Sequence, residues 1–145
     1  MECLDASIVV KWFKEDEDLR EESLEILRQA GKKPGNYAAS EWLVLELVRG
    51  LIKAGIDEEI IRSDYAVMKA LSMRGMLTEV PVSIVTDLAK DLEINLKLYA
   101  VDAVHLATAI KTGSSVLWTE DEHFHKKSVK EYAAGYGLAI KGLDE

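Results

Sequence analysis

The sequence predicts an α/β protein: a three-layer α/β/α sandwich with a central parallel sheet of four to five strands and a protruding helical hairpin. Short apolar segments of strand length alternate along the chain with longer segments of helical periodicity. Such alternation favours a parallel sheet that helices cover on both faces. The chain has 145 residues, 48% of them hydrophobic, which suits one core. We therefore expect residues 1–145 to form a single domain.

The first part of the chain is predicted to contain two strands and two helices. Asp5 and Ser7 follow the first apolar run and favour a helix start, and we expect Ser7 to cap that helix. The next helix alternates acidic residues with leucine and isoleucine, a pattern typical of an amphipathic surface helix. The expected elements are a strand at 1–4, a short helix at 8–13, the surface helix at 15–29 and a minimal strand at 37–39.

Two consecutive helices are predicted next, and they form the helical hairpin. The first covers 40–54, with Ser40 as its N-cap and Gly55 just past its end. The second covers 57–74, where apolar residues recur at helical spacing. Because a short connection joins the two, we expect them to pack side by side as an αα-hairpin.

The last part of the chain returns to alternating strands and helices. An almost wholly apolar helix begins near Tyr99 and stops at Gly113, and a short buried strand follows at 115–118. If this helix and strand pack antiparallel, their acidic ends lie at the same edge of the domain. The other expected elements are a strand at 77–80, a helix at 84–92 capped by Ser83, a connecting segment after Asp121 and a last strand at 138–140.

The charge balance of the chain is acidic, with 18 Lys and Arg against 26 Asp and Glu and a net charge of −8. Such an excess does not suggest a nucleic-acid binder, because phosphate contacts need clustered cations, although bound divalent ions would offset part of it. No apolar run approaches the roughly 20 residues of a membrane span, so no membrane association is expected. No signal peptide is visible, and the single cysteine, Cys3, fits a reducing compartment. We therefore predict a cytoplasmic protein.

Several familiar catalytic motifs are missing from the sequence. It contains neither of the common glycine-rich phosphate-binding loops nor a nucleophile elbow. Cys3 lies in a predicted strand and is interpreted as a structural thiol. His123 and His125 have no cysteine pair beside them, so their spacing does not indicate structural zinc. His105, on the apolar helix, is interpreted as a core or interface residue.

Acidic residues are the remaining candidates for a functional site. Asp5 and Asp121 follow predicted strands and Asp102 lies at a helix start, so all three fall at the carboxyl edge of a parallel sheet, where open α/β folds bind ligands. Glu46 could reach the same edge from the helical hairpin. Carboxylates without Cys or His select hard cations such as Mg²⁺ or Mn²⁺.

Structural roles also explain two of these acids, and the sequence leaves them open. Asp5 is of a residue type that favours helix starts, so, taken alone, it is better interpreted as a helix cap or turn residue. Glu46 is followed on the same helix by Arg49 and Lys53, and a salt bridge to either would satisfy its charge.

Four segments, in order along the chain, resemble the PIN-domain nucleases. They are LDAS at 4–7, LELVRGL at 45–51, VDAVHLATA at 101–109 and TEDEHF at 119–124. Their spacing and the chain length are most similar to the VapC-type toxins of prokaryotic toxin–antitoxin pairs. The resemblance spans essentially the whole chain. It implies a single PIN-like domain, with a parallel sheet flanked by helices and a protruding helical pair at 40–74.

The resemblance also implies a metal site and an activity. The implied activity is Mg²⁺- or Mn²⁺-dependent endoribonuclease cleavage of a P–O bond in structured RNA. The family's hydroxyl residues, which position the metal ligands, fall on Ser7 and Thr119. Its catalytic and metal-binding acids fall on Asp5, Glu46, Asp102 and Asp121.

The partners that the resemblance implies are an RNA substrate, a second copy of the chain and an antitoxin. VapC-like proteins form homodimers, and a VapB-like antitoxin covers the acidic site, commonly with an Arg. The acidic balance of this chain departs from the expectation of an RNA-binding surface. Arg49 and Lys53 are the predicted RNA contacts. The further basic candidates are Lys11, Lys14, Lys126 and Lys127.

Two other function classes compete with the nuclease. A non-catalytic PIN-like module would use its acidic pocket only to bind a basic peptide, and Mn²⁺ titration discriminates between the two. A phosphotransfer or receiver-like domain would use Asp5 as a nucleophile, but it also needs a lysine at a later strand end, and residues 119–121 offer none. The metal-dependent ribonuclease is therefore the leading hypothesis.

Overall fold

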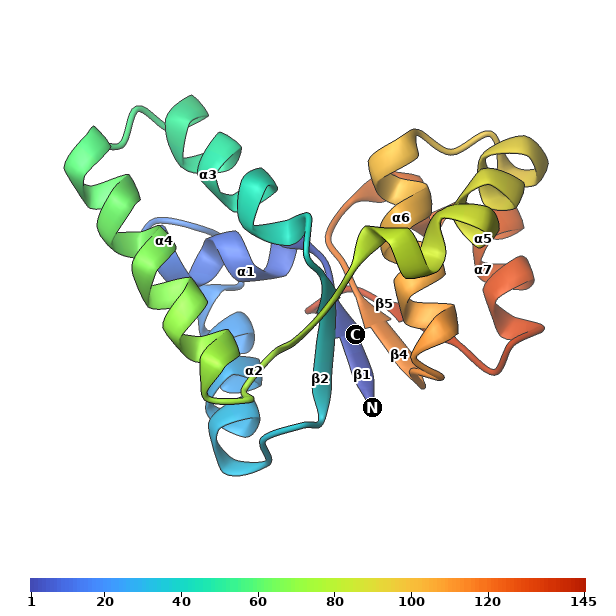
Figure 1. Ribbon diagram of the computed structural model, residues 1–145, viewed down its shortest axis with the longest axis horizontal. Coiled ribbons are helices and arrows are strands. Elements are labelled where there is room, and N and C mark those ends of the chain that lie inside the picture. The colour runs from blue at the N-terminus through green and yellow to red at the C-terminus, as the bar shows by residue number, and fades with distance from the viewer.

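Five parallel strands form the central sheet of the computed structural model, which describes residues 1–145 (Figure 1). The strands are β1 (Glu2–Leu4), β2 (Tyr37–Ser40), β3 (Thr78–Val80), β4 (Val116–Trp118) and β5 (Ala139–Lys141). Their order across the sheet is β3-β2-β1-β4-β5, and every neighbouring pair is parallel. Because β1 and β4 are neighbours, the residues that follow them meet at one edge of the sheet.

Helices cover both faces of this sheet, with α1 to α4 on one side of the strands and α5 to α7 on the other (Figure 1). The helices are α1 (Ala6–Phe13), α2 (Arg20–Lys32), α3 (Leu43–Lys53), α4 (Glu58–Met73), α5 (Val82–Leu96), α6 (Ala100–Lys111), the 3₁₀ helix η1 (Glu122–His125) and α7 (Lys127–Ala134). None of them combines the length and the apolar composition that crossing a bilayer requires.

The sheet separates two apolar cores. Successive residues of a strand point to opposite faces, so Cys3 packs with the α5–α7 side and Leu4 with the α1–α4 side. Each core contains 16 buried residues, and Phe124 and Leu47 are among the largest side chains of the two. Two cores on the two faces of one sheet confirm the predicted three-layer α/β/α sandwich.

The predicted helical hairpin is formed by α3 and α4, which project from the sandwich (Figure 1). Gly55 makes the turn between them with a φ of 74°, a conformation that a side chain would strain. Leu47 of α3 and Met68 of α4 are fully buried and anchor the two helices to the core. This anchoring positions Glu46, which precedes Leu47 in α3.

Two predicted N-caps of the later helices are wrong. Ser40 belongs to β2, because it pairs in register with Val80, so α3 begins beyond it. Ser83 lies inside α5, whose first backbone amide, that of Val82, donates a hydrogen bond to the Glu41 carboxylate at 2.8 Å. A side chain distant in sequence therefore satisfies the donor that a local cap was expected to satisfy.

Part of the chain that the sequence pattern predicts to be a connecting segment is helical. The segment after Asp121 contains η1 and α7, because Phe124 and Val129 turn into the core and give it a buried face. In the opposite sense, α2 begins later than predicted. Its N-cap Leu19 has a left-handed backbone with a φ of 58°, which a continuous α-helix does not allow. The helix therefore cannot extend through Leu19 towards residue 15.

Candidate functional site

Asp5 lies at the carboxyl edge of the sheet, where β1 ends and α1 begins. Its Oδ1 accepts hydrogen bonds from the Ser7 backbone N–H at 2.9 Å and from the Ser7 hydroxyl at 2.5 Å. Asp5, not Ser7, is therefore the N-cap of α1. Its Oδ2 accepts a hydrogen bond from Thr119 Oγ1 at 2.5 Å. The predicted role of Asp5 as a helix cap is thus correct. This role is compatible with Asp5 also contributing to a functional site.

The Asp5 carboxylate is buried, with 4% of the residue exposed, and it forms no ion pair. Burial raises its pKa above the usual value, and the Glu46 carboxylate adds to the rise, while His105 and the hydroxyls of Ser7 and Thr119 act against it. An ionised Asp5 is therefore short of positive charge, which a bound cation would supply.

Thr119 and Ser7 tie the end of β4 to the start of α1. The fully buried Thr119 hydroxyl donates to Asp5 and accepts a hydrogen bond from the Asp121 backbone N–H at 3.0 Å. Ser7 Oγ accepts a hydrogen bond from the Glu120 backbone N–H at 2.8 Å. These two hydroxyls therefore hold the predicted acidic residues by direct hydrogen bonds, as positioning residues would.

A histidine lies in contact with the carboxylates of both Asp102 and Asp121. His123 Nδ1 is 3.5 Å from Asp102 Oδ2 and 3.2 Å from Asp121 Oδ1. One potential ligand atom from each of these three residues lies within 4.8 Å of the others. Burial raises the pKa of Asp102, and the charges of Asp121 and Asp5 raise it further. The three side chains form a candidate metal centre with two oxygen donors and one nitrogen donor.

His123 is the residue of this centre that the sequence interpretation missed. Its distance of two residues from Asp121 is the signal that could have found it. Asp121 caps η1 by accepting a hydrogen bond from the His123 backbone N–H at 2.9 Å, and this turn brings the imidazole to the carboxylates. His125 lies differently, with its Nε2 at 2.9 Å from the Thr119 carbonyl oxygen. Only one histidine of the pair therefore adjoins the acids.

Glu46 reaches the site from α3 through a hydrogen bond from His105 of α6. Nε2 of the buried His105 donates to Glu46 Oε1. Glu46 forms no ion pair with Arg49 or Lys53, so the predicted salt-bridge alternative is wrong. Burial by itself lowers the pKa of His105, but the carboxylates of Glu46 and Asp5 raise it above its usual value overall. His105 is a core residue, as predicted, and it also holds Glu46 at the acids.

The predicted acids gather at one edge of the sheet, but they do not form a single ligand cluster. Asp102 and Asp121 offer oxygen atoms within ligand range of His123. Asp5 and Glu46 lie outside that group but close enough to act on it, because Asp5 raises the pKa of Asp102 and Glu46 raises that of Asp5. No lysine or arginine pairs with any of the four, which leaves their negative charge for an external cation.

The model of the PIN domain family matches residues 3–130 of the chain. The chain belongs to the PIN domain family. No curated protein shows significant sequence similarity to this PIN domain. Its identity to the solved structures below is under 25%, so the likeness to them is one of fold.

Solved structures with this fold include components of toxin–antitoxin systems. A toxin–antitoxin complex from Klebsiella pneumoniae is 21% identical with a TM-score of 0.61, over 96% of both chains. Mycobacterium tuberculosis VapC20, a Sarcin-Ricin loop cleaving toxin, is 15% identical with a TM-score of 0.67, over 86% of this chain and 93% of that chain. VapBC2 from Rickettsia felis, bound to a DNA fragment from their promoter, is 18% identical with a TM-score of 0.61, over 97% of each chain.

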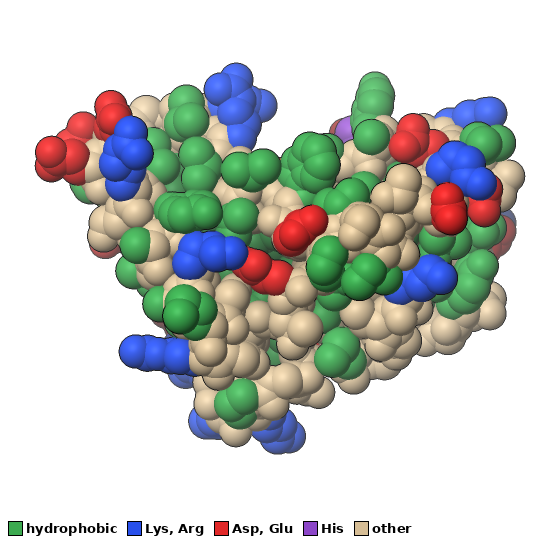
Figure 2. Space-filling model, in the orientation of Figure 1, with side chains coloured by type: hydrophobic (Ala, Val, Ile, Leu, Met, Phe, Trp, Pro, Cys, Tyr) green, Lys and Arg blue, Asp and Glu red, His purple; other side chains and the backbone are tan.

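The basic residues predicted to contact RNA differ in their exposure and pairing. Figure 2 shows Lys and Arg side chains scattered over the visible face. The predicted RNA contacts Arg49 and Lys53 are exposed on the hairpin. Lys11 is buried and donates to a backbone carbonyl at 2.7 Å, and Lys14 pairs with Glu17 at 3.0 Å. Lys11 and Lys14 therefore already have partners within the protein, whereas Arg49 and Lys53 are exposed.

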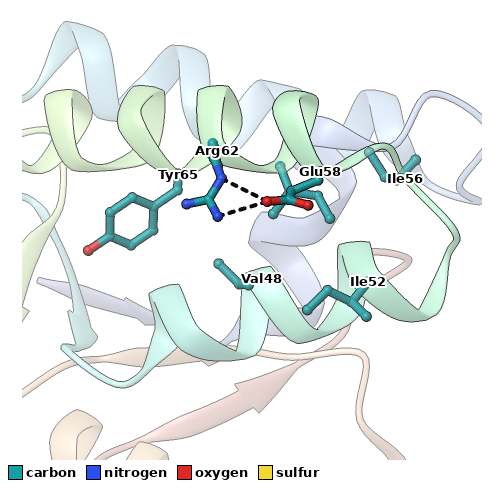
Figure 3. Close-up of a pocket in the computed structure, with 7 residues that line it drawn as sticks. Val48, Ile52, Ile56, Glu58, Arg62 and Tyr65 are labelled. Atoms are coloured by element: carbon teal, nitrogen blue, oxygen red, sulfur yellow. Dashed lines mark hydrogen bonds and ion pairs between the residues drawn. The ribbon is translucent and has the colours of Figure 1, made fainter.

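An apolar groove of about 590 Å³ lies between α3 and α4 of this PIN domain. Figure 3 shows Val48 and Ile52 of α3 facing Tyr65 and the Glu58–Arg62 pair of α4. Arg62 donates to the Glu58 carboxylate at 2.8 Å, so the polar rim of the groove is paired within the helix. An apolar surface of this kind is typical of a docking site for a partner helix.

Proposed function

We propose that this PIN domain is a Mg²⁺- or Mn²⁺-dependent endoribonuclease. The observation that carries the proposal is the group of Asp102, Asp121 and His123 ligand atoms within 4.8 Å of one another, beside a buried Asp5 without a cationic partner. PIN domains are generally nucleases, and perturbed carboxyl groups gathered at one edge of a sheet are typical of active sites.

The donor atoms fit a divalent cation. Asp102, Asp121 and His123 would hold it, with Asp5 and Glu46 beside them. Carboxylate oxygens suit Mg²⁺ and Mn²⁺, and an imidazole nitrogen adds a preference for Mn²⁺. When bound, such a cation neutralises phosphate charge and lowers the pKa of a coordinated water, which makes a nucleophile near neutral pH.

The protein's own side chains prepare this site in two ways. Hydrogen bonds from Ser7 and Thr119 fix the Asp5 carboxylate, and the bond from His105 fixes Glu46, so little reorganisation is needed on binding. The gathered negative charge also repels an RNA phosphate until a cation is present. RNA binding at the acids and cleavage should therefore both depend on divalent ions.

We further propose that the chain is the toxin of a VapBC-type pair, acting in the cytoplasm. Structures with this fold include toxin–antitoxin complexes from Klebsiella pneumoniae and Rickettsia felis and the Sarcin-Ricin loop cleaving toxin VapC20 of Mycobacterium tuberculosis. A VapB-like antitoxin with an amphipathic helix would suit the apolar α3–α4 groove, and a basic tail would suit the acids. The single cysteine, Cys3, is buried and unpaired, which fits a reducing cytoplasm.

A homodimer is the assembly that we propose for this toxin. Large apolar side chains remain exposed near the start of α3 and α5, among them Leu45 at 59% and Ile84 at 60%. A second copy covering these residues would remove them from water. Light scattering should give twice the chain mass, and Leu45→Glu should give a monomer. A wild-type monomer at micromolar concentration would contradict the dimer.

The nuclease is tested by pairing metal binding with RNA cleavage. Asp102→Asn and Asp121→Asn should lose both Mn²⁺ binding, measured by electron paramagnetic resonance, and cleavage of RNA, while circular dichroism stays unchanged. Glu122→Gln removes an exposed neighbouring carboxylate and is the matched control, which should keep both. A wild-type protein that binds a basic antitoxin peptide but neither Mn²⁺ nor RNA would contradict the nuclease and support a non-catalytic binding module.

A further inference from the structure

An exposed aromatic side chain stands beside the acidic site. Tyr99 is the N-cap of α6 and is 74% exposed, far more than the core aromatic residues. Its ring meets that of His123 edge to face, with centroids 5.8 Å apart and an interplanar angle of 66°. The Tyr99 carbonyl accepts the first helical hydrogen bond of α6, from Ala103 at 2.9 Å, so the residue has a fixed backbone. Tyr99 therefore presents a held aromatic surface to solvent.

The contact with His123 ties this ring to the candidate metal centre. His123 touches Asp102 and Asp121 through Nδ1, and Tyr99 lies one helical turn before Asp102. The order in space is thus an exposed phenol ring, an imidazole and two carboxylates. A nucleotide whose phosphate lies at the carboxylates would have its neighbouring base within reach of the ring.

The charge of the protein favours a base contact of this kind in RNA binding. The net charge is −8, and no lysine or arginine forms an ion pair with Asp102, Asp121 or Glu46. Phosphate contacts and counterion release therefore supply little affinity at this edge of the domain. Stacking of bases on aromatic side chains is the other main source of affinity for single strands.

We propose that Tyr99, braced by His123, is a stacking platform for an unpaired nucleobase next to the phosphate that is cleaved. This inference rests on the proposed ribonuclease function and adds the side chain that would hold a base beside the cleaved phosphate. The faces of bases are covered by their neighbours in an A-form helix, whereas loops, bulges and single strands can present them. The substrate is then RNA that is unpaired at the cleavage site.

The surroundings of Tyr99 favour a base over a protein partner as the occupant. The ring contacts the imidazole of His123, and its exposed neighbours along the chain are Lys97 and Ala100. The surfaces proposed above for protein partners are the α3–α4 groove and the exposed Leu45 and Ile84, and Tyr99 belongs to neither. A single ring with polar neighbours matches one stacked base.

The test compares single-stranded and duplex RNA binding in Ca²⁺, with full-length variants. Fluorescence anisotropy of a labelled single-stranded RNA of mixed sequence should show Tyr99→Ala weakening binding roughly five- to one-hundred-fold. Tyr99→Phe keeps the ring and should stay within about two-fold of wild type. Tyr136→Ala removes another exposed tyrosine, 54% exposed and packed on Tyr132, and is the matched control. The affinity for a blunt RNA duplex should be the same for wild type and Tyr99→Ala.

Two further readouts separate stacking from other roles. With Mn²⁺, Tyr99→Ala should raise KM for RNA cleavage and leave kcat nearly unchanged, because the ring holds the substrate and does not touch the reacting atoms. Wild-type binding should depend weakly on salt, with a log–log slope of about −2 or shallower.

The outcomes that overturn the inference are distinct. If wild-type protein cleaves RNA and Tyr99→Ala binds the single strand equally well, Tyr99 has no stacking role, and the proposed nuclease function is unaffected. A change in oligomeric mass on light scattering of Tyr99→Ala, with RNA binding unaltered, assigns the ring to a protein interface instead. Wild-type protein that neither binds nor cleaves RNA contradicts the nuclease and the stacking platform together.

Discussion

His105 donates a hydrogen bond to Glu46 across 59 residues of sequence, and this contact joins the helical hairpin to the central helix α6. His105 is buried, and its other ring nitrogen, Nδ1, has no hydrogen-bond partner. The imidazole therefore depends on Glu46 for its polar contact inside the protein, and Glu46 depends on it for its position. The pair couples the packing of α3 on the domain to the arrangement of the acids.

His105→Ala should destabilise the protein by about 2–4 kcal/mol, because the change leaves a cavity and removes the partner of a half-buried carboxylate. Urea unfolding followed by tryptophan fluorescence measures the change. Glu46→Gln keeps a side chain of similar shape and is the gentler comparison, with a smaller expected loss. Equal stability of His105→Ala and wild type would contradict the structural role of the pair.

Stability of the metal-free protein should fall as pH rises above neutral. The pKa of His105 is raised in the folded state from its ordinary value of 6.5, because the nearby carboxylates outweigh burial. A group with a raised folded pKa contributes stability that is complete below its unfolded pKa and is lost as pH rises through the folded pKa. Urea midpoints across this range, in the presence of a chelator, should show the slope. His105→Gln should flatten it, and an unchanged slope in that variant would assign the effect to other groups.

Asp5→Asn should stabilise the metal-free protein at neutral pH while removing the metal response. The pKa of Asp5 is raised by burial, so its stabilising contribution exists at acid pH and is lost as pH rises through the folded pKa. Asn remains a good N-cap for the Ser7 amide and carries no charge, so a gain of about 1 kcal/mol is expected. Thermal unfolding with and without Mn²⁺ measures both effects, since a ligand that binds only the folded state raises Tm. A less stable Asp5→Asn would contradict the uncompensated charge.

Much of the fold and part of the site could be predicted from local patterns. Asp5 and Asp121 follow strands, and strand order is the only further information needed to bring them to one edge. The parallel sheet, the helical hairpin and the family are confirmed. The roles of the acids, hydroxyls and basic residues stay predictions, which the variants above and below test.

Other features depend on packing that no local pattern records. The partner of Glu46 is set by how α3 and α6 meet, so the residues of its own helix predict Arg49 or Lys53, whereas the structure has His105. The sequence pattern predicts a connection where α7 lies, because the lysines of α7 mask the buried face that Val129 contributes. In both cases the deciding contacts lie far away in the sequence.

Thr119→Val should weaken the junction between β1 and β4. The isosteric change removes the donor to Asp5 and the acceptor for the Asp121 amide, both in a buried position, and should cost about 1–3 kcal/mol. Thr119→Ser keeps the hydroxyl and should recover most of the stability and of any RNA cleavage. Thr86→Val, at an exposed threonine of α5, is the matched control and should change neither. Equal stability of Thr119→Val and Thr119→Ser would show that the Thr119 hydroxyl does not hold Asp5 and Asp121 in position.

His123→Ala should change which metal the site prefers. Nitrogen donors favour Mn²⁺ over Mg²⁺, whereas carboxylate oxygens accept both, so losing the imidazole should lower Mn²⁺ affinity roughly tenfold or more and Mg²⁺ affinity less. Isothermal titration gives both affinities, and pulsed electron paramagnetic resonance of bound Mn²⁺ should show coupling to a nitrogen nucleus in wild type that is lost in the variant. Glu122→Gln, whose side chain is exposed beside His123 in sequence, should keep the coupling and both affinities.

Nitrogen coupling that persists in His123→Ala would assign the ligand to another residue. An unchanged ratio of the two affinities would mean that the imidazole lies at the carboxylates without binding the ion.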